Sequence, residues 1–175
     1  MTFNNKIAIA AAIVAMVTTG NVLAATDGDQ GTTSTGSTTL SVTKQSEVKI
    51  SGLSDIALTV QSDGSATGST DACIYRHGTG SYSVTATGSG GASAFSLSDG
   101  NTGVMPYSVT FNDGSGAAPM TLATALTGRS NANTLSATCN GATNATIEVA
   151  VNTADFSSAP AGDYTGTLTL VIAPE

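Results

Sequence analysis

Few side chains in this sequence of 175 residues could carry out chemistry, and their spacing is poorly suited to catalysis. Nucleophilic catalysis requires a nucleophile and a base within hydrogen-bond reach of each other. His77 is the sole histidine, and it stands in the turn-like stretch RHGTG between two apolar runs. A loop histidine flanked by arginine and glycine is most often simply solvated, so we expect no catalytic base there.

The carboxylates offer no better prospect of catalysis. Asp63, Asp99 and Asp113 each precede a glycine, and the preference of Asp-Gly pairs for tight turns explains them. Glu148 lies in an alternating run with the parity opposite to its apolar neighbours, so we expect it to face solvent. Glycoside hydrolysis needs two carboxylates on rigid elements around a cleft. The sequence therefore predicts no enzyme, no cofactor and no metal site.

The N-terminal segment indicates export. MTFNNK supplies a basic residue, and the apolar run IAIAAAIVAMV that follows is shorter than the ~20 residues of a membrane span. TTGNVLAA then adds small residues before a switch to polar sequence. This order is typical of a secretory signal peptide. We expect residues 1–25 to be the signal, with cleavage after either Ala24 or Ala25.

The two cysteines, Cys73 and Cys139, are best explained as a disulfide. An even number of cysteines in an exported chain favours disulfide formation. The bond would close a loop of about 67 residues, for which the chain-entropy estimate is roughly 4 kcal/mol. Metal binding is the alternative, and it is weakened because the chain has one histidine and no second cysteine near either of these two.

The mature chain is acidic. All twelve Asp and Glu residues follow the signal segment, and the basic residues after it are Lys44, Lys49, Arg76 and Arg129. An acidic surface disfavours nucleic acid and anionic membrane as partners, and it otherwise suits an ordinary soluble surface.

The elements that would position these residues are short strands. Residues 26–39 contain mostly Thr, Gly, Ser and Asp and should form a flexible arm. Alternation starts at Leu40 and continues with a polar joint at Lys44 and Ser46. Frequent Gly, Asn and Asp turns and the lack of long helical periodicity predict a β-sandwich or barrel. Further strands are expected at 56–60, 72–76, 81–87, 94–97, 104–111, 120–126, 133–139 and 145–151, with a core mostly of Val, Ile, Leu and Ala.

The stretch AGDYTGTLTLVIAPE predicts one more strand. Its apolar face carries Tyr164, Leu168, Leu170 and Ile172, and threonines occupy the other face. A strand so apolar on one face usually has neighbours on both sides, because a long exposed edge invites pairing with another chain. The sequence continues for three residues after Ile172, and this pattern alone leaves open what lies beside the strand on its other edge.

Four features together resemble pilin subunits of chaperone–usher fimbriae. They are the signal, the alternating stretch TTLSVTKQSEVKISGLSDIALT, the cysteine strand with tyrosine alternation CIYRHGTGSYSVTATGSG, and the ending AGDYTGTLTLVIAPE. The sequence is most similar to the archaic and alternative branches, which include spore-coat-protein-U-like domains and colonisation-factor subunits. The resemblance covers about residues 38–175.

The resemblance implies an immunoglobulin-like β-sandwich, residues 45–175, that lacks its final strand. A periplasmic chaperone first fills the gap, and the N-terminal arm of the next subunit then replaces it by donor-strand exchange. Residues 26–44 would be that arm, with Leu40 and Val42 as donor side chains. Tyr164, Leu168, Leu170 and Ile172 would form the edge strand of the acceptor groove. An outer-membrane usher would export identical or related subunits as a homopolymeric fimbria at the cell surface, for adhesion or biofilm formation.

Two further functions stay open. The chain could be a minor or tip subunit that binds a host or surface receptor, although a single-domain tip subunit generally has no spare donor arm. It could also be a stand-alone secreted carbohydrate-binding sandwich. Such modules usually display aromatic platforms, and this chain has no Trp and four Tyr.

Overall fold

The computed structural model describes residues 25–90 and 94–175 of the chain. The expected signal peptide, residues 1–25, falls outside them except for Ala25. Two units divide the chain, Met1–Thr43 and Lys44–Glu175. The described part of the first unit has little regular structure, and in it Thr26 and Ser37 exchange two backbone hydrogen bonds of 2.9 Å.

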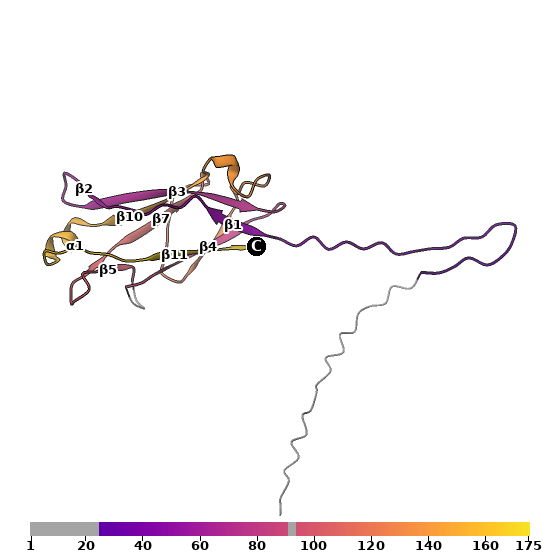
Figure 1. Cartoon of the computed structure of the whole chain (residues 1–175), viewed down its shortest axis with the longest axis horizontal. Coiled ribbons are helices and arrows are strands. Elements are labelled where there is room, and N and C mark those ends of the chain that lie inside the picture. Colours follow the sequence, from indigo (N-terminus) through magenta and orange to yellow (C-terminus); the bar gives the residue numbers. More distant parts are fainter. Residues whose placement is uncertain (1–24, 91–93) are drawn as a thin grey trace, which may run out of the picture. The chain divides into compact units, whose positions relative to one another are not determined.

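The domain Lys44–Glu175 consists almost entirely of short strands joined by turns (Figure 1). The strands are β1 (Val48–Ser51), β2 (Thr59–Val60), β3 (Ala66–Arg76), β4 (Tyr82–Gly88), β5 (Ser96–Ser98), β6 (Val104–Pro106), β7 (Ser108–Asn112), β8 (Ala118–Pro119), β9 (Ala125–Arg129), β10 (Ala145–Val151) and β11 (Leu168–Pro174). A short helix α1 (Thr153–Ser158) and a 3-10 turn η1 (Cys139–Gly141) complete the described elements. Within residues 25–90 and 94–175 we find no helix with the length and hydropathy for a membrane crossing.

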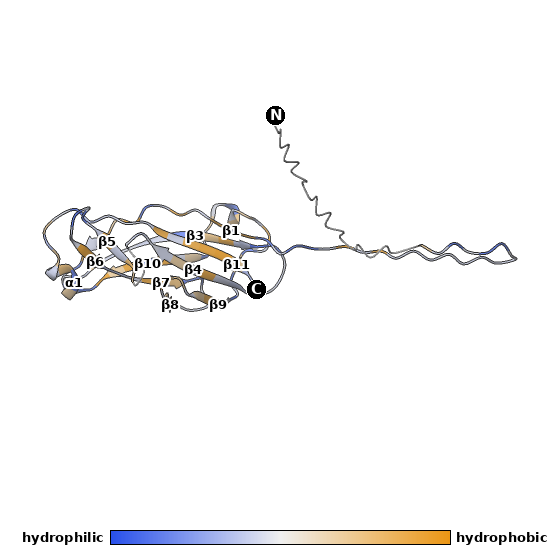
Figure 2. Ribbon diagram, turned by 90° about the horizontal axis from the view of Figure 1, so that it is seen from below, coloured by the Kyte–Doolittle hydropathy of each residue, from blue (hydrophilic) through white to orange (hydrophobic). Residues whose placement is uncertain are grey.

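The strands form two main antiparallel sheets around an apolar core. The larger sheet has the order β1-β3-β10-β7-β8, with β2 also paired to β3, and the smaller has the order β11-β4-β9. Ile74, Val84, Phe111 and Ile147 come from both sheets and are fully buried. Figure 2 shows hydrophobic residues along these strands and hydrophilic ones in many of the turns. The expected all-β, immunoglobulin-like sandwich is confirmed, with the sandwich open along one side.

One expected strand is wrong. Residues 133–139 alternate in sequence, but the side-chain oxygen of Asn133 accepts the backbone amides of Leu135 (2.9 Å) and Ser136 (2.8 Å). Such local side-chain bonds compete with a strand ladder and favour a turn. The segment therefore loops out to η1, and Leu135 is 93% exposed.

Two other expected strands are shorter or displaced. Of residues 56–60, only β2 pairs with β3. In the expected strand 120–126, Ala123 has a φ of 56°, which an extended strand does not allow, so β9 begins at Ala125. Conversely, β3 is longer than the expected 72–76, because it begins at Ala66.

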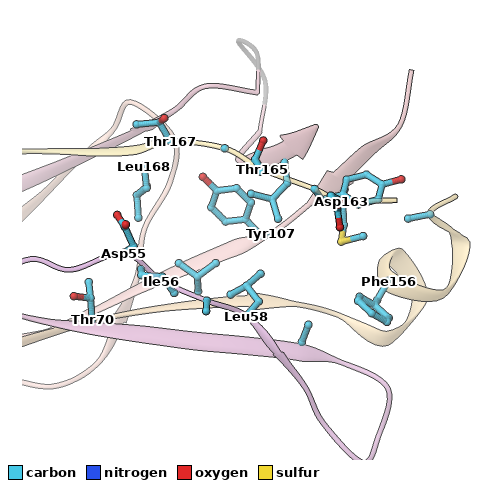
Figure 3. A pocket seen from close by; sticks show the side chains of 18 of the residues that line it. Asp55, Ile56, Leu58, Thr70, Tyr107, Phe156, Asp163, Thr165, Thr167 and Leu168 are labelled. Carbon is cyan, nitrogen blue, oxygen red and sulfur yellow. The ribbon is translucent and has the colours of Figure 1, made fainter. Parts of the chain in front are cut away.

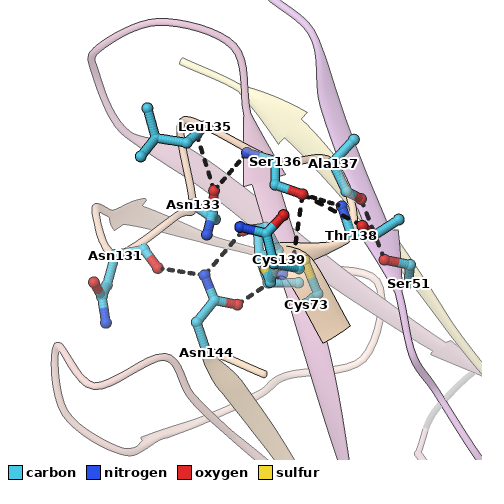
Figure 4. The surroundings of a disulfide bond; sticks show 12 residues. Ser51, Cys73, Asn131, Asn133, Leu135, Ser136, Ala137, Thr138, Cys139 and Asn144 are labelled. Carbon is cyan, nitrogen blue, oxygen red and sulfur yellow. Dashed lines mark hydrogen bonds between the residues drawn. A yellow bond between two sulfur atoms is a disulfide. The ribbon is translucent and has the colours of Figure 1, made fainter. Parts of the chain in front are cut away.

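The disulfide between Cys73 and Cys139 is present, as predicted. It joins β3 to η1 with a Cα–Cα distance of 5.8 Å (Figure 4). Asn144 supports the same region, because its side chain accepts the amide of Ile74 (2.7 Å) and donates to the carbonyl oxygens of Ile74 (2.9 Å) and Asn131 (3.0 Å). The disulfide and these hydrogen bonds of the Asn144 side chain hold the irregular segment before β10 against the larger sheet.

A buried ion pair joins β4, β9 and the loop after β7. Asp113, expected only to make a turn, is fully buried beside Tyr82. Its carboxylate accepts hydrogen bonds from the Tyr82 hydroxyl (2.7 Å), the Ser115 amide (3.1 Å) and the Arg129 guanidinium. Burial raises the pKa of Asp113, but these three donors and the Arg129 charge outweigh it and hold the pKa below its ordinary value. Burial, together with the bond to Asp113, raises the pKa of Tyr82.

Replacing both Cys73 and Cys139 with serine should lower the free energy of unfolding by roughly 4 kcal/mol, because the unfolded chain regains the freedom that a 66-residue separation removes. Urea unfolding followed by circular dichroism measures the change. Equal unfolding midpoints for the double variant and the oxidised wild type would contradict it.

The low pKa of Asp113 should make stability depend on pH. A carboxyl group whose pKa is lower when folded stabilises the protein above its unfolded pKa, and that contribution is lost as the pH falls through the folded value. The free energy of unfolding should therefore decrease as the pH falls below about 4.

Asp113→Asn should be less stable by about 3–5 kcal/mol at neutral pH, because it leaves Arg129 buried without its charge partner, and its stability should vary less with acid. Glu148→Gln removes an exposed carboxylate of β10 and is the matched control, with a change within about 0.5 kcal/mol. Parallel pH profiles for wild type and Asp113→Asn would contradict the assignment.

Candidate functional site

A groove with an apolar floor opens along one side of the domain. Its volume is about 1020 Å³, and the chain segments 53–60 and 162–170 form its two walls. Figure 3 shows Asp55, Ile56 and Leu58 on one wall, Thr165 and Leu168 on the other, and Tyr107 between the walls. The groove thus lies where an edge of the larger sheet faces the edge of the smaller one.

The first wall is a bulge in the edge of the larger sheet. β1 and β2 both pair with the same strand β3, through Ser51–Cys73 and Thr59–Thr67. Between these two pairs the wall contains residues 52–58, whereas β3 contains only residues 68–72. The wall therefore has two extra residues, and it bends away from the ladder. Gly52, with a φ of 81°, starts this departure.

Two contacts fix the wall against β3. The Thr70 hydroxyl accepts the Ser54 backbone amide at 3.0 Å and hydrogen-bonds the Ser54 hydroxyl at 3.0 Å. Gly68 lets the wall pass closely, because a Cβ there would lie 2.7 Å from the carbonyl oxygen of Ala57. Residues 53–58 of the wall are therefore held without a strand ladder, and Ile56 and Leu58 are directed into the groove (Figure 3).

The second wall is β11 with the residues that precede it. β11 pairs with β4 from Leu168 to Pro174, and the described residues place no strand on its other edge. Before β11, Thr165 pairs with Ser98, and the Tyr164 hydroxyl donates to the carbonyl oxygen of Pro160 at 3.0 Å. The backbone groups on the open edge of β11 are available to another strand.

The floor of the groove is apolar. Ile147 and Val149 of β10 contribute to it, and so does Tyr107, which stacks on Phe95 with 5.5 Å between ring centroids. Burial raises the pKa of the Tyr107 hydroxyl above its ordinary value. An apolar floor between two backbone edges suits an extended peptide with alternating apolar side chains.

The charged residues of the groove are carboxylates. Asp55 and Asp163 line it, and the set of lining residues includes no Lys, Arg, His or Cys. No group of three potential metal ligands occurs in the part of the chain that the structure describes.

The structure brings together three of the four residues expected at the acceptor edge. Tyr164, Leu168 and Leu170 line the groove. Ile172 lies on the same face of β11 but beyond the groove, where it packs against the core. Leu40 and Val42, the expected donor residues, belong to the N-terminal unit and are 91% and 94% exposed.

The sequence pattern does not reveal the first wall or the floor as parts of a site. The wall residues 53–58 have no clear alternation, and their role depends on a bulge against a strand that follows later in the chain. Gly68 inside a strand was the available signal, since a strand glycine often marks close approach of another backbone.

Two solved structures from fimbriae are similar to this chain. A chain of the chaperone–tip adhesin complex of CFA/I fimbriae matches with a TM-score of 0.51 and 16% identity, over 74% of this chain and 41% of that chain. CfaE, the adhesive subunit of CFA/I fimbria of enterotoxigenic Escherichia coli, matches with a TM-score of 0.47 and 15% identity, over 67% of this chain and 38% of CfaE. No family model and no curated protein matches the sequence.

This chain spans about two fifths of the length of the solved chains that it matches. At these identities the likeness shows the fold, and the fold is the one found in fimbrial proteins of the CFA/I type. The resemblance to chaperone–usher pilins is confirmed at that level.

Proposed function

We propose that this chain is a structural subunit of a surface fimbria and that it polymerises by donor-strand exchange. The observation that carries the proposal is the open groove with an apolar floor between the 53–60 wall and the edge of β11. The arm before the domain supplies a suitable occupant, since Leu40 and Val42 share a parity and are almost fully exposed.

The dimensions of groove and arm are compatible. Because the wall bulges, its length along the groove follows β3, whose six steps from Thr67 to Cys73 span about 20 Å at roughly 3.3 Å per residue. The six steps of segment 38–44 span the same length when extended, and alternate residues of it would face the floor. Backbone hydrogen bonds to the edges would supply affinity, and the side chains entering the groove would supply selectivity.

The domain also supports one direction for the proposed assembly. The arm joins the domain beside the end of β11, because the His77 amide donates to the carbonyl oxygen of Glu47 (2.8 Å) and Arg76 donates to that of Glu175 (3.0 Å). Residues 160–163, at the start of the second wall, lie at the other end of the groove. In a neighbour stacked end to end, the arm would enter beside 160–163 and run antiparallel to β11. Such a head-to-tail contact does not close on itself and therefore yields a filament.

The proposal includes the partners and the location that the pilin resemblance implies. A periplasmic chaperone would cover the groove before assembly, and an outer-membrane usher would pass subunits to the cell surface. Identical or related subunits would then form the fimbria, which would serve adhesion or biofilm formation.

A tip or minor adhesive subunit is the second candidate. It is favoured by the match to a chaperone–tip adhesin complex, in which this chain covers 41% of the matched chain. The arm with Leu40 and Val42 argues for a shaft subunit, because a subunit at the tip donates no strand to a further neighbour.

Leu40→Asp and Val42→Asp should each give subunits that fold but fail to join. Burying such an apolar side chain contributes roughly 1.5–3 kcal/mol, and a carboxylate in the groove would be buried without a partner. The polymer yield should fall more than tenfold. The measurement is the heat-resistant ladder on a gel after fibres are sheared from cells.

Ser41→Asp is the matched control, because its side chain has the opposite parity, and it should reduce the ladder much less. Equal ladders from Leu40→Asp, Val42→Asp and the wild type would reject this donor register. Normal fibres after deletion of residues 26–44 would reject donor-strand assembly itself.

The outer part of the arm should tolerate change. Deleting residues 27–31 removes turn-like polar sequence that precedes the alternating part, so polymer yield should stay within about twofold of the wild type. The same gel assay applies. Loss of fibres on this deletion would show that the donor segment starts earlier than residue 38.

A further inference from the structure

Charge is distributed unequally between the groove and the arm. The groove carries Asp55 and Asp163 and no basic side chain among its lining residues. The arm has no charged residue from Gln30 to Thr43, and then comes Lys44. Lys44 shares the parity of Leu40 and Val42, so in an extended strand its side chain projects on the same side.

The direction of assembly would bring Lys44 of one copy to Asp163 of the next. In an antiparallel strand, Leu40 opposite Leu170 puts Lys44 opposite Gly166, and Leu40 opposite Leu168 puts it opposite Tyr164. Both positions lie one to three residues from Asp163, which is about 3–10 Å along the strand. The long, flexible lysine stem can span such a distance.

A chain whose arm folds back into its own groove cannot make this contact. Each Lys44 lies at the far end of its own domain, next to Gly78, where a Cβ on the glycine would be 3.5 Å from the lysine Nζ. That end also holds Glu175, whose amide donates to the carbonyl oxygen of Ser81 at 2.9 Å. From Glu175 back to Asp163 the chain runs twelve residues, or about 40 Å of extended strand. An arm folded back into its own groove would run parallel to β11 and leave Lys44 beside Glu175.

We propose that Lys44 of one copy and Asp163 of the next form an ion pair at the mouth of the groove, and that this pair favours insertion of the arm antiparallel to β11. The proposal rests on the donor-strand function above. Both side chains are exposed in the isolated subunit, so the pair acts mainly on the encounter and on the direction of insertion.

Charge reversal tests the pair. The full mature chain, with its disulfide intact, is incubated at low salt, and the heat-resistant ladder is followed over time. Lys44→Glu should slow ladder formation roughly fivefold, and so should Asp163→Lys. The double variant Lys44→Glu/Asp163→Lys should recover most of the wild-type rate. In about 1 M salt the differences should largely disappear, since screening then acts over about 3 Å.

Three controls separate the ion pair from a general charge effect, from the other carboxylate of the groove and from loss of the fold. Lys49→Glu reverses an exposed charge in β1 and should leave the rate unchanged. Asp55→Lys tests the other carboxylate and should not rescue Lys44→Glu. Asp163→Asn, with thermal unfolding compared to the wild type, separates loss of the pair from loss of the fold.

The outcomes distinguish this inference from the proposed function. If Lys44→Glu forms the ladder at the same rate as the wild type, the proposed ion pair is wrong, but donor-strand exchange still stands. The assignment to Asp163 is also overturned if Asp55→Lys rescues Lys44→Glu. It is overturned as well if neither Asp55→Lys nor Asp163→Lys rescues Lys44→Glu. A wild-type chain that forms no ladder overturns both proposals.

Discussion

Backbone hydrogen bonding along the edge of β11 is the constraint on which the other features of this domain depend. β11 has a ladder with β4 on one side, while its other edge faces the groove. Opposite that edge, residues 53–58 of the wall leave the ladder with β3 and line the other side of the groove. Two edges that flank an apolar floor are expensive to leave in water, because apolar area stays hydrated and the edges invite pairing with any extended chain. The sandwich is therefore open at one defined place, between β11 and residues 53–60.

The other side of the domain compensates for that open side. The disulfide and the Asn144 hydrogen bonds fix the irregular segment before β10 to β3. The Asp113–Arg129 ion pair, together with Tyr82, connects β4 and β9 to the loop after β7. Both devices lie outside the groove. The domain can thus keep one defined shape while its groove stays open, and a preformed groove lowers the ordering entropy of binding a strand.

The sequence predicted those parts of the structure that follow from local pattern. The alternation of β11, β10 and β4 identified strands and their inner faces, and two cysteines in an exported chain predicted the disulfide. Asp113 was misjudged because an Asp-Gly turn explains it locally, whereas its partners Tyr82 and Arg129 are 31 and 16 residues away. The strand expected at 133–139 failed for the opposite reason, since the Asn133 side chain forms local bonds that alternation does not reveal. The groove wall at 53–58 could not be derived because it depends on how that segment crosses Gly68.

The attachment of the arm has a mechanical consequence. A pulling force on Lys44 enters the domain at the start of β1, whose four residues pair with β3 from Val48–Arg76 to Ser51–Cys73. Tension along the strand direction loads these pairs in shear, so they resist together rather than opening one after another. The last pair in the row contains Cys73, which is covalently joined to Cys139. A load that reaches this point passes into a covalent crosslink, which gives the domain an anchor against stretching at the place where a filament would transmit tension.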